Sequence, residues 1–219
     1  MPLNPRAVAF DLDGILVDTE PIFVEAIRRY LAPRGLAFDA DFMHTMMGTP
    51  AAQSVPRFRE RYRLTDSIEL IALECREHFV AALGDRPGPL MPGVPELVHG
   101  LRDRDVPFCI ATSSGSEFVR RVFGPHGLLD HFHFVLTCED VKRGKPAPDV
   151  YELAAQRFEV APAEMLVFED SPNGLRAAKA AGAQCVVVPH AHTPLHLLDE
   201  ADLIVPGLHS DELREALGW

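Results

Sequence analysis

Two aspartates, Asp11 and Asp13, stand one residue apart directly after a short apolar run at residues 8–10. The run suits a buried strand, and Gly14 behind it permits a sharp backbone turn. Ligands of a parallel sheet bind at the carboxyl ends of its strands. Because buried charge without compensation is costly, two carboxylates at such an end need a cation or a proton beside them. The stretch predicts a catalytic carboxylate pair that holds a hard cation. The alternative is a strand that leads into an ordinary acidic loop.

A second apolar run, at residues 165–168, also ends in acid, at Glu169 and Asp170. Adjacent side chains of an extended chain point in opposite directions, so both reach one cation only where the strand has turned into its loop. Carboxylates and backbone carbonyls are the ligands that Mg²⁺ takes in proteins. The alternative is that Asp170 or Ser171 only caps the helix predicted to begin near Pro172.

Two further segments carry groups that could bind an anion. Residues 111–116, ATSSGS, follow an apolar strand and supply hydroxyls and backbone N–H groups before a helix start. Such a start makes either an anion site or an ordinary N-cap. Lys145 lies between Gly144 and Pro146, which hold its backbone in a turn. It could clamp charge beside the carboxylates, or belong to a solvated basic loop.

The elements that must position these residues alternate along the chain. Strands are predicted at residues 7–10, 107–112, 134–137, 165–168, 184–188 and 203–205. Helices are predicted between them at residues 94–104, 116–126, 148–158 and 172–181, and after the last strand at residues 211–217. Strands separated by helices of this length predict an α/β fold with a parallel, doubly wound sheet.

The stretch from residue 19 to residue 83 has helical spacing and no convincing strand, with helices predicted up to about residue 35 and at 42–47, 51–62 and 67–83. One predicted apolar face consists of Phe23, Ala26, Ile27, Tyr30 and Leu31. The last helix is predicted to begin at a Ser67 cap and to bury Leu70, Ile71, Leu73 and Phe79. The methionines Met43, Met46 and Met47 are predicted to fill a core.

Residues 84–93, GDRPGPLMPG, are rich in proline and glycine and predict a hinge. The first strand belongs with the later strands, so the helical stretch is an insertion. We predict an α/β core of residues 1–17 and 90–219, interrupted by an all-helical cap of residues 18–89.

The composition limits the partners. The chain of 219 residues has a formal net charge of −11, which argues against a nucleic-acid surface or an anionic membrane. A bound divalent cation can still reverse the local field for an anionic substrate. No apolar run approaches the ~20 residues that span a bilayer.

The cysteines predict a compartment. Cys75, Cys109, Cys138 and Cys185 are far apart, and the second and fourth lie in apolar runs typical of buried free thiols. A reducing compartment, the cytoplasm, fits this pattern. We expect a monomer. His190 and His192 are expected to be surface residues of a proline-bounded loop.

Taken together, four motifs resemble those of the haloacid dehalogenase superfamily of phosphohydrolases. They are DLDGILVDTEP at residues 11–21, ATSSGS at 111–116, GKPAPD at 144–149 and FEDSPNGLRAAKAAG at 168–182. The chain is similar in particular to the branch that contains β-phosphoglucomutase, sugar-phosphate phosphatases and pseudouridine 5′-phosphatase. The resemblance implies a Rossmann-like core with a helical cap inserted after the first strand.

The resemblance also implies roles for the acidic residues. Asp11 would be the nucleophile that forms an aspartyl-phosphate, and Asp13 the general acid and base. Mg²⁺ would be held by Asp11, the backbone carbonyl of Asp13 and Asp170, with Glu169 as a fourth contact, direct or through water.

For the substrate phosphate, the resemblance implies three contacts. The Thr112 hydroxyl and the Ser113 backbone N–H would hold phosphoryl oxygens. Lys145 would neutralise charge between Asp11 and the phosphate. The substrate would be a small phosphorylated metabolite, either a sugar phosphate or a nucleoside monophosphate.

Two departures from the mutase pattern favour a phosphatase. Phe23 stands where the mutase has a histidine, and the loop at residues 48–51 lacks the arginine of the mutase cap. Four arginines at alternate positions, Arg57, Arg59, Arg61 and Arg63, could supply a cap phosphate site or form a solvated face. A hexose-phosphate mutase and a non-enzymatic binding module stay as alternatives, while Asp13 argues against a dehalogenase.

Overall fold

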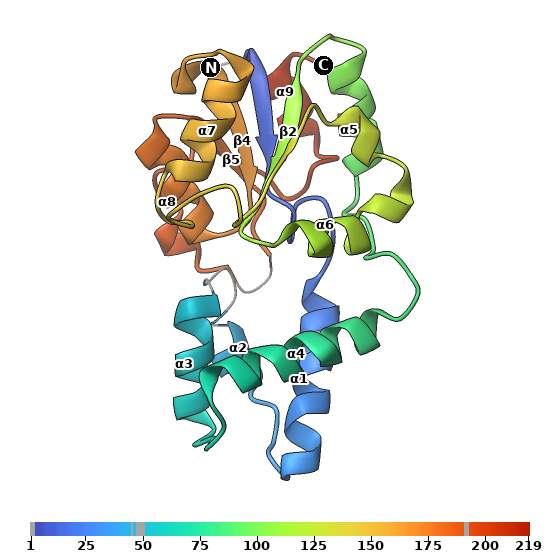
Figure 1. The fold of residues 1–219 in the computed structure, drawn as a ribbon. Coiled ribbons are helices and arrows are strands. Elements are labelled where there is room, and N and C mark those ends of the chain that lie inside the picture. Colours follow the sequence, from blue (N-terminus) through green and yellow to red (C-terminus); the bar gives the residue numbers. More distant parts are fainter. Residues whose placement is uncertain (1–2, 45, 47–50, 191–192) are drawn as a thin grey trace. The chain divides into compact units, whose positions relative to one another are not determined.

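The computed structural model of the protein, drawn in Figure 1, describes residues 3–44, 46, 51–190 and 193–219. Six strands form one sheet in the order β3-β2-β1-β4-β5-β6, and all neighbouring strands are parallel. The strands are β1 (Ala7–Phe10), β2 (Phe108–Ala111), β3 (Val135–Leu136), β4 (Met165–Glu169), β5 (Gln184–Val187) and β6 (Leu203–Ile204). This is the strand order of a doubly wound, Rossmann-like sheet, so the predicted fold class is confirmed.

Helices lie between and after these strands where the sequence predicts them. They are α5 (Val94–Arg102), α6 (Ser116–Val122), α7 (Asp149–Phe158), α8 (Pro172–Ala181) and α9 (Asp211–Leu217). The predicted helix at residues 116–126 is shorter, because Pro125 lies in a separate 3-10 turn, Gly124–His126. In Figure 1, α7 and α8 lie on one side of the sheet and α5 and α6 on the other.

Alternation along β1 supplies both faces of the sheet, since successive side chains point to opposite sides. Ala7 and Ala9 belong to the apolar cluster that includes Tyr151 of α7 and Leu175 of α8. Val8 and Phe10 point to the opposite face of the sheet. Phe10 stacks there on Phe168 of β4, with ring centroids 5.0 Å apart. The strand is fully buried on both faces and therefore has a fixed register and a fixed end.

The described chain separates into two compact units, Met1–Asp18 with Pro87–Trp219, and Thr19–Arg86. The first unit includes the residues just before residue 90, where the sequence predicts that the core resumes. Two hydrogen bonds hold them there: the N–H of Gly88 donates to Val122 O (2.9 Å), and the N–H of Asp18 donates to Pro89 O (2.8 Å). The predicted limits of the cap, residues 18 and 89, and its hinge stay predictions.

The Thr19–Arg86 unit is helical: α1 (Glu20–Leu31), α2 (Ala40–His44), α3 (Ala51–Arg61) and α4 (Ile68–Leu83). Ser67 caps α4 as predicted, since its side chain accepts from the Leu70 N–H at 3.2 Å. The core of this helical unit includes Ile27, Tyr30 and Leu31 of α1 together with Met46, and Met43 packs against it. The predicted role of these two methionines is confirmed, while Met47 lies outside the described residues.

The burial predicted for three apolar side chains of this unit is wrong. Leu70 and Leu73 are 40% and 53% exposed, and Phe23 is 42% exposed. The buried stripe of α4 runs through Ile71, Phe79 and Leu83, which are spaced by multiples of four residues. Leu70 and Leu73 lie off this stripe because a helix turns by about 100° per residue.

Two of the four cysteines have the burial that the sequence predicts. Cys109 and Cys185 are buried free thiols, as predicted.

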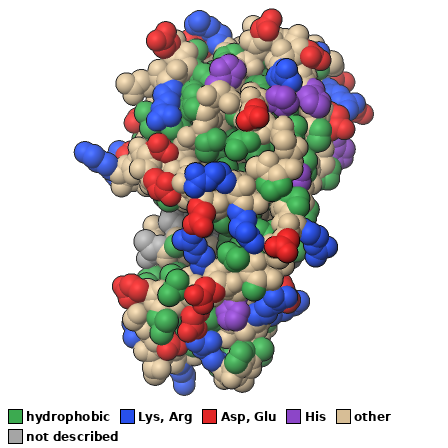
Figure 2. Space-filling model, turned by 45° about the vertical axis from the view of Figure 1, so that its right-hand side comes forward, with side chains coloured by type: hydrophobic (Ala, Val, Ile, Leu, Met, Phe, Trp, Pro, Cys, Tyr) green, Lys and Arg blue, Asp and Glu red, His purple; other side chains and the backbone are tan. Residues whose placement is uncertain are grey.

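Within the described residues, no helix has the length and apolar character needed to cross a bilayer. On the face of the described chain drawn in Figure 2, acidic and basic side chains are interspersed.

One buried group of the helical unit predicts a stabilising substitution. The Tyr30 hydroxyl is buried and has no hydrogen-bond partner within the described part of the chain. A buried hydroxyl without a partner costs about 1–3 kcal/mol. We expect Tyr30→Phe to raise the free energy of unfolding by about 1 kcal/mol in urea titrations, because the ring still packs on Phe58 and the Arg34 guanidinium. If Tyr30→Phe instead lowered the free energy of unfolding by a similar amount, the hydroxyl would have a hydrogen-bond partner.

Candidate active site

The turn after β1 presents Asp11 at the carboxyl end of the central strand. The N–H of Asp11 donates to Phe168 O (3.0 Å), and the next residues close a turn through the N–H of Leu16, which donates to Leu12 O at 2.9 Å. Gly14 sits in this turn with φ +77°, and an added Cβ would lie 2.5 Å from Asp170 Oδ2. The position therefore requires glycine both for its backbone angle and for the close approach of the second acidic loop.

Lys145 joins this turn to two other strands. Its Nζ donates to Asp11 Oδ1 (2.7 Å), Glu169 Oε1 (2.6 Å) and the backbone oxygen of Ala111 (2.9 Å). The side chain is only 6% exposed. The structure thus confirms that Lys145 lies beside the carboxylates rather than in a solvated basic loop.

Glu169, the last residue of β4, is fully buried and accepts five hydrogen bonds. Its Oε1 accepts from Lys145 and from the Tyr151 hydroxyl, each at 2.6 Å. Its Oε2 accepts from the backbone N–H groups of Asp170 and Ser171 and from the Ser171 hydroxyl. Ser171 also caps α8, because its Oγ accepts from the Gly174 N–H at 3.0 Å.

The hydroxyl segment after β2 contacts the second aspartate of the first motif. The Ser114 hydroxyl donates to Asp13 Oδ2 at 2.8 Å. The Thr112 hydroxyl is buried and accepts from the Ser114 N–H at 3.0 Å, which fixes the start of the loop. Ser113 follows with an exposed side chain. The roles predicted for Thr112 and Ser113 in holding phosphate stay predictions.

His190 is not the plain surface residue that we expected. Its side chain is 19% exposed, and its Nε2 lies 3.1 Å from Gly14 O and 3.6 Å from Asp170 Oδ2. The loop after β5 carries it there, with the N–H of His190 donating to the Thr193 hydroxyl. The sequence hides this contact because it depends on the order of β1, β4 and β5 in the sheet. His192 lies outside the described residues.

Burial and like charges set the protonation of the cluster. Burial, with Glu169 and Asp13 nearby, raises the pKa of Asp11 from 3.8 to about 7, although Lys145 opposes the shift. Burial and the neighbouring carboxylates also raise the pKa of Asp170 well above its usual range. Burial favours neutral Lys145, but Asp11 and Glu169 together hold its pKa above the ordinary value. The cluster therefore has more carboxyl groups than its one ammonium can keep ionised.

Comparison with known proteins agrees with this geometry. Residues 5–182 match the haloacid dehalogenase-like hydrolase family. The chain belongs to this family. It is therefore an enzyme of the hydrolase class, and the resemblance drawn from the four motifs is confirmed.

Two curated relatives and one solved structure illustrate the similarity. The chain is 38% identical over 186 residues to a probable pseudouridine-5′-phosphatase of Drosophila melanogaster, covering 82% of this chain and 80% of that protein. It is 32% identical over 183 residues to a phosphorylated carbohydrates phosphatase of Thermotoga maritima, covering 82% of each. CbbY of Rhodobacter sphaeroides, solved in complex with phosphate, superposes with a TM-score of 0.82 at 27% identity, covering 98% of this chain and 100% of that one.

The acidic cluster of this hydrolase has the donor set of a metal site. Asp11, Glu169 and Asp170 each offer a carboxylate oxygen, and these atoms lie within 4.8 Å of one another. Asp170 is the first residue after β4. The chain turns there, so the side chains of Glu169 and Asp170 can face the same point. A set of oxygen donors with more carboxyl groups than ammonium groups fits a hard divalent cation.

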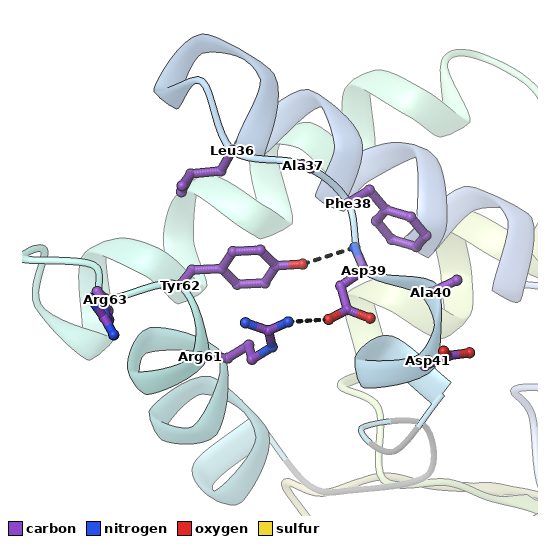
Figure 3. Close-up of a pocket in the computed structure, with 9 residues that line it drawn as sticks. All are labelled: Leu36, Ala37, Phe38, Asp39, Ala40, Asp41, Arg61, Tyr62 and Arg63. Carbon is purple, nitrogen blue, oxygen red and sulfur yellow. Dashed lines mark hydrogen bonds and ion pairs between the residues drawn. The ribbon is translucent and has the colours of Figure 1, made fainter.

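An open pocket of about 610 Å³ lies in the helical unit (Figure 3), and its lining does not carry this chemistry. Asp39 pairs with Arg61, and the N–H of Asp39 donates to the Tyr62 hydroxyl at 3.1 Å. The charged groups at its centre neutralise each other. Arg57, Arg59, Arg61 and Arg63 are all exposed, which agrees with a solvated face; a phosphate site among them stays a prediction.

Three contacts of the site have no signal in the sequence alone: Ser114, Tyr151 and His190. Ser114 lies in the predicted hydroxyl segment, but nothing in that segment distinguishes it from its neighbours. Tyr151 follows the GKPAPD motif by two residues and looks like an ordinary core aromatic. Each is identified by which strand ends meet, a property of the tertiary fold.

The pKa of Asp11 predicts how stability changes with pH in the metal-free hydrolase. Because this pKa is higher in the folded chain, folding takes up a proton between about pH 4 and pH 7, and stability falls as pH rises through this window. We expect Asp11→Asn to weaken this fall and to stabilise the protein at pH 8 by on the order of a few kcal/mol. Urea unfolding in EDTA at a series of pH values measures the free energy of unfolding of both proteins. The exposed Asp85→Asn is the control, and an unchanged pH slope in Asp11→Asn would contradict the assignment.

A second prediction concerns Gly174, in the first turn of α8. A Cβ added there would overlap the carboxyl group of Glu169, which Lys145 and Tyr151 hold from the other side. We expect Gly174→Ala to destabilise the protein by about 2 kcal/mol in thermal or urea unfolding. Gly144→Ala, which meets open space next to Lys145, is the matched control and is expected to change stability little.

Proposed function

We propose that this hydrolase is a Mg²⁺-dependent phosphatase that releases phosphate from a small phosphorylated metabolite through an aspartyl-phosphate intermediate. The observation that carries the proposal is the buried contact of Lys145 with Asp11, at the strand end where Ser114 also holds Asp13. A carboxylate beside a fixed ammonium, with a second carboxylate two residues on, is the set of groups that phosphoryl transfer in two displacements needs.

In the first displacement, a carboxylate oxygen of Asp11 attacks phosphorus and the bond from phosphorus to the ester oxygen breaks. Asp13, protonated, gives its proton to the leaving oxygen. In the second displacement, Asp13 takes a proton from water, whose oxygen attacks phosphorus, and the bond to Asp11 breaks. Inorganic phosphate leaves, and Asp13 is protonated as at the start.

The remaining residues orient the phosphoryl group. The Thr112 hydroxyl and the Ser113 N–H stand at the carboxyl end of β2, beside β1, and would donate to phosphoryl oxygens. A bound Mg²⁺, held by Asp11, the Asp13 carbonyl and Asp170, would offset the repulsion between carboxylate and phosphate. Both oxygens of Glu169 already accept hydrogen bonds, which favours its contact with the ion through water.

The relatives support the substrate class. The two relatives are a probable pseudouridine-5′-phosphatase and a phosphorylated carbohydrates phosphatase. We infer a sugar phosphate or a nucleoside monophosphate as substrate. We further propose that the enzyme is cytoplasmic and monomeric, without a nucleic-acid or membrane partner. The free thiols at Cys75, Cys109, Cys138 and Cys185 support the cytoplasmic compartment.

Phosphate release from a panel of sugar phosphates and nucleoside monophosphates tests the proposal. We expect release that requires Mg²⁺ and falls by at least ~10³-fold in Asp11→Asn and in Asp13→Asn, since each removes a group that acts on the reacting atoms. Mass spectrometry of the quenched wild type is expected to find a phosphoryl group on Asp11. Conversion of β-glucose 1-phosphate to glucose 6-phosphate without phosphate release would contradict it and favour the mutase.

A further inference from the structure

Tyr151 makes a contact that the proposed mechanism leaves without a role. It is the third residue of α7 and is fully buried. Its hydroxyl donates to Glu169 Oε1 at 2.6 Å, the same oxygen that accepts from Lys145. Its ring centroid lies 4.9 Å from Lys145 Nζ, within the range of a cation–π contact.

Lys145 has no donor left for a substrate. An ammonium group has three N–H donors, and those of Lys145 point to Asp11, Glu169 and the Ala111 carbonyl. Contact with a phosphoryl oxygen therefore requires Lys145 to release one of these three acceptors.

Glu169 Oε1 is the acceptor that can be released with least loss. It keeps a second donor, the Tyr151 hydroxyl, and a buried oxygen that retains a hydrogen bond avoids most of the penalty of desolvation. The Glu169 side chain does not follow Lys145, because its Oε2 is held by the N–H groups of Asp170 and Ser171. With Glu169 fully buried, solvent cannot take the place of the missing donor.

We propose that Tyr151 is a positioning residue whose hydroxyl keeps Glu169 Oε1 hydrogen-bonded while Lys145 turns from that oxygen to the phosphoryl oxygen of the substrate. This inference rests on the proposed function and assigns the exchange of hydrogen bonds that accompanies substrate binding. Tyr151 touches neither the substrate nor the reacting atoms; it acts through Glu169 and Lys145.

Tyr151→Phe isolates the hydroxyl, since the ring and its contact with Lys145 remain. Without the hydroxyl, Lys145 must stay on Glu169 or leave its Oε1 unpaired. At saturating Mg²⁺ we expect about a tenfold rise in the Kd of inorganic phosphate, by titration calorimetry, and in KM for p-nitrophenyl phosphate. The value of kcat should stay within about twofold, because the contact with the phosphoryl group is made in the ground state and in the transition state alike.

Two controls separate this role from a structural one. Tyr30→Phe removes another buried tyrosine hydroxyl and is expected to leave both constants unchanged. In a Lys145→Met background, Tyr151→Phe should have no further effect on the phosphate Kd, since the hydroxyl acts through Lys145. Equal phosphate Kd values for wild type and Tyr151→Phe, or the same tenfold loss in the Lys145→Met background, would overturn the inference.

A structure of the wild type with phosphate and Mg²⁺ tests the same exchange if Tyr151→Phe does not fold. Lys145 Nζ on a phosphate oxygen, with the Tyr151 hydroxyl still on Glu169, is the expected result; Lys145 still on Glu169 would overturn the inference. A wild type that binds phosphate but hydrolyses no phosphomonoester would refute the proposed function, whereas an active wild type matched by Tyr151→Phe would refute only this inference.

Discussion

The buried ammonium group of Lys145 is the interaction on which the polar edge of the sheet depends. Lys145 is 134 residues from Asp11 and 24 from Glu169 in sequence, so the three charges meet only when β1 and β4 are paired. Removing the Lys145 ammonium would leave Asp11 and Glu169 buried without a positive partner, at a cost of about 3–5 kcal/mol. Folding of the sheet and assembly of the site are therefore the same event.

Small side chains on one face of the sheet make this arrangement possible. Ala7 and Ala9 of β1 lie in the same apolar cluster as Ala154 of α7, and alanines keep the distance between helix and sheet short. Tyr151 of α7 belongs to the same cluster, and its hydroxyl donates to Glu169, the last residue of β4. The packing of the core thus sets the geometry of the hydrogen bonds at its edge.

Local sequence was sufficient to predict the strands, the parallel sheet and the positions of the two acidic pairs, because apolar runs mark buried strands and each acidic pair stands at the end of one. It was insufficient for Tyr151 and His190, whose contacts depend on which strand ends become neighbours. The exposure of Leu70 and Leu73 was also missed, since both are apolar and near a helical stripe but turned off it. Periodicity identifies a helix more reliably than it identifies which of two adjacent faces is covered.

The register of β1 and β4 has a consequence for how proteins of this kind can change over time. Phe10 pairs with Phe168, so the two acidic loops leave the sheet at the same level. One residue inserted into or deleted from either strand would shift its carboxylate by about 3.3 Å and turn it to the opposite face. Descendants of this gene can therefore gain or lose residues in the loops far from these strand ends, while the lengths of β1 and β4 must be inherited unchanged.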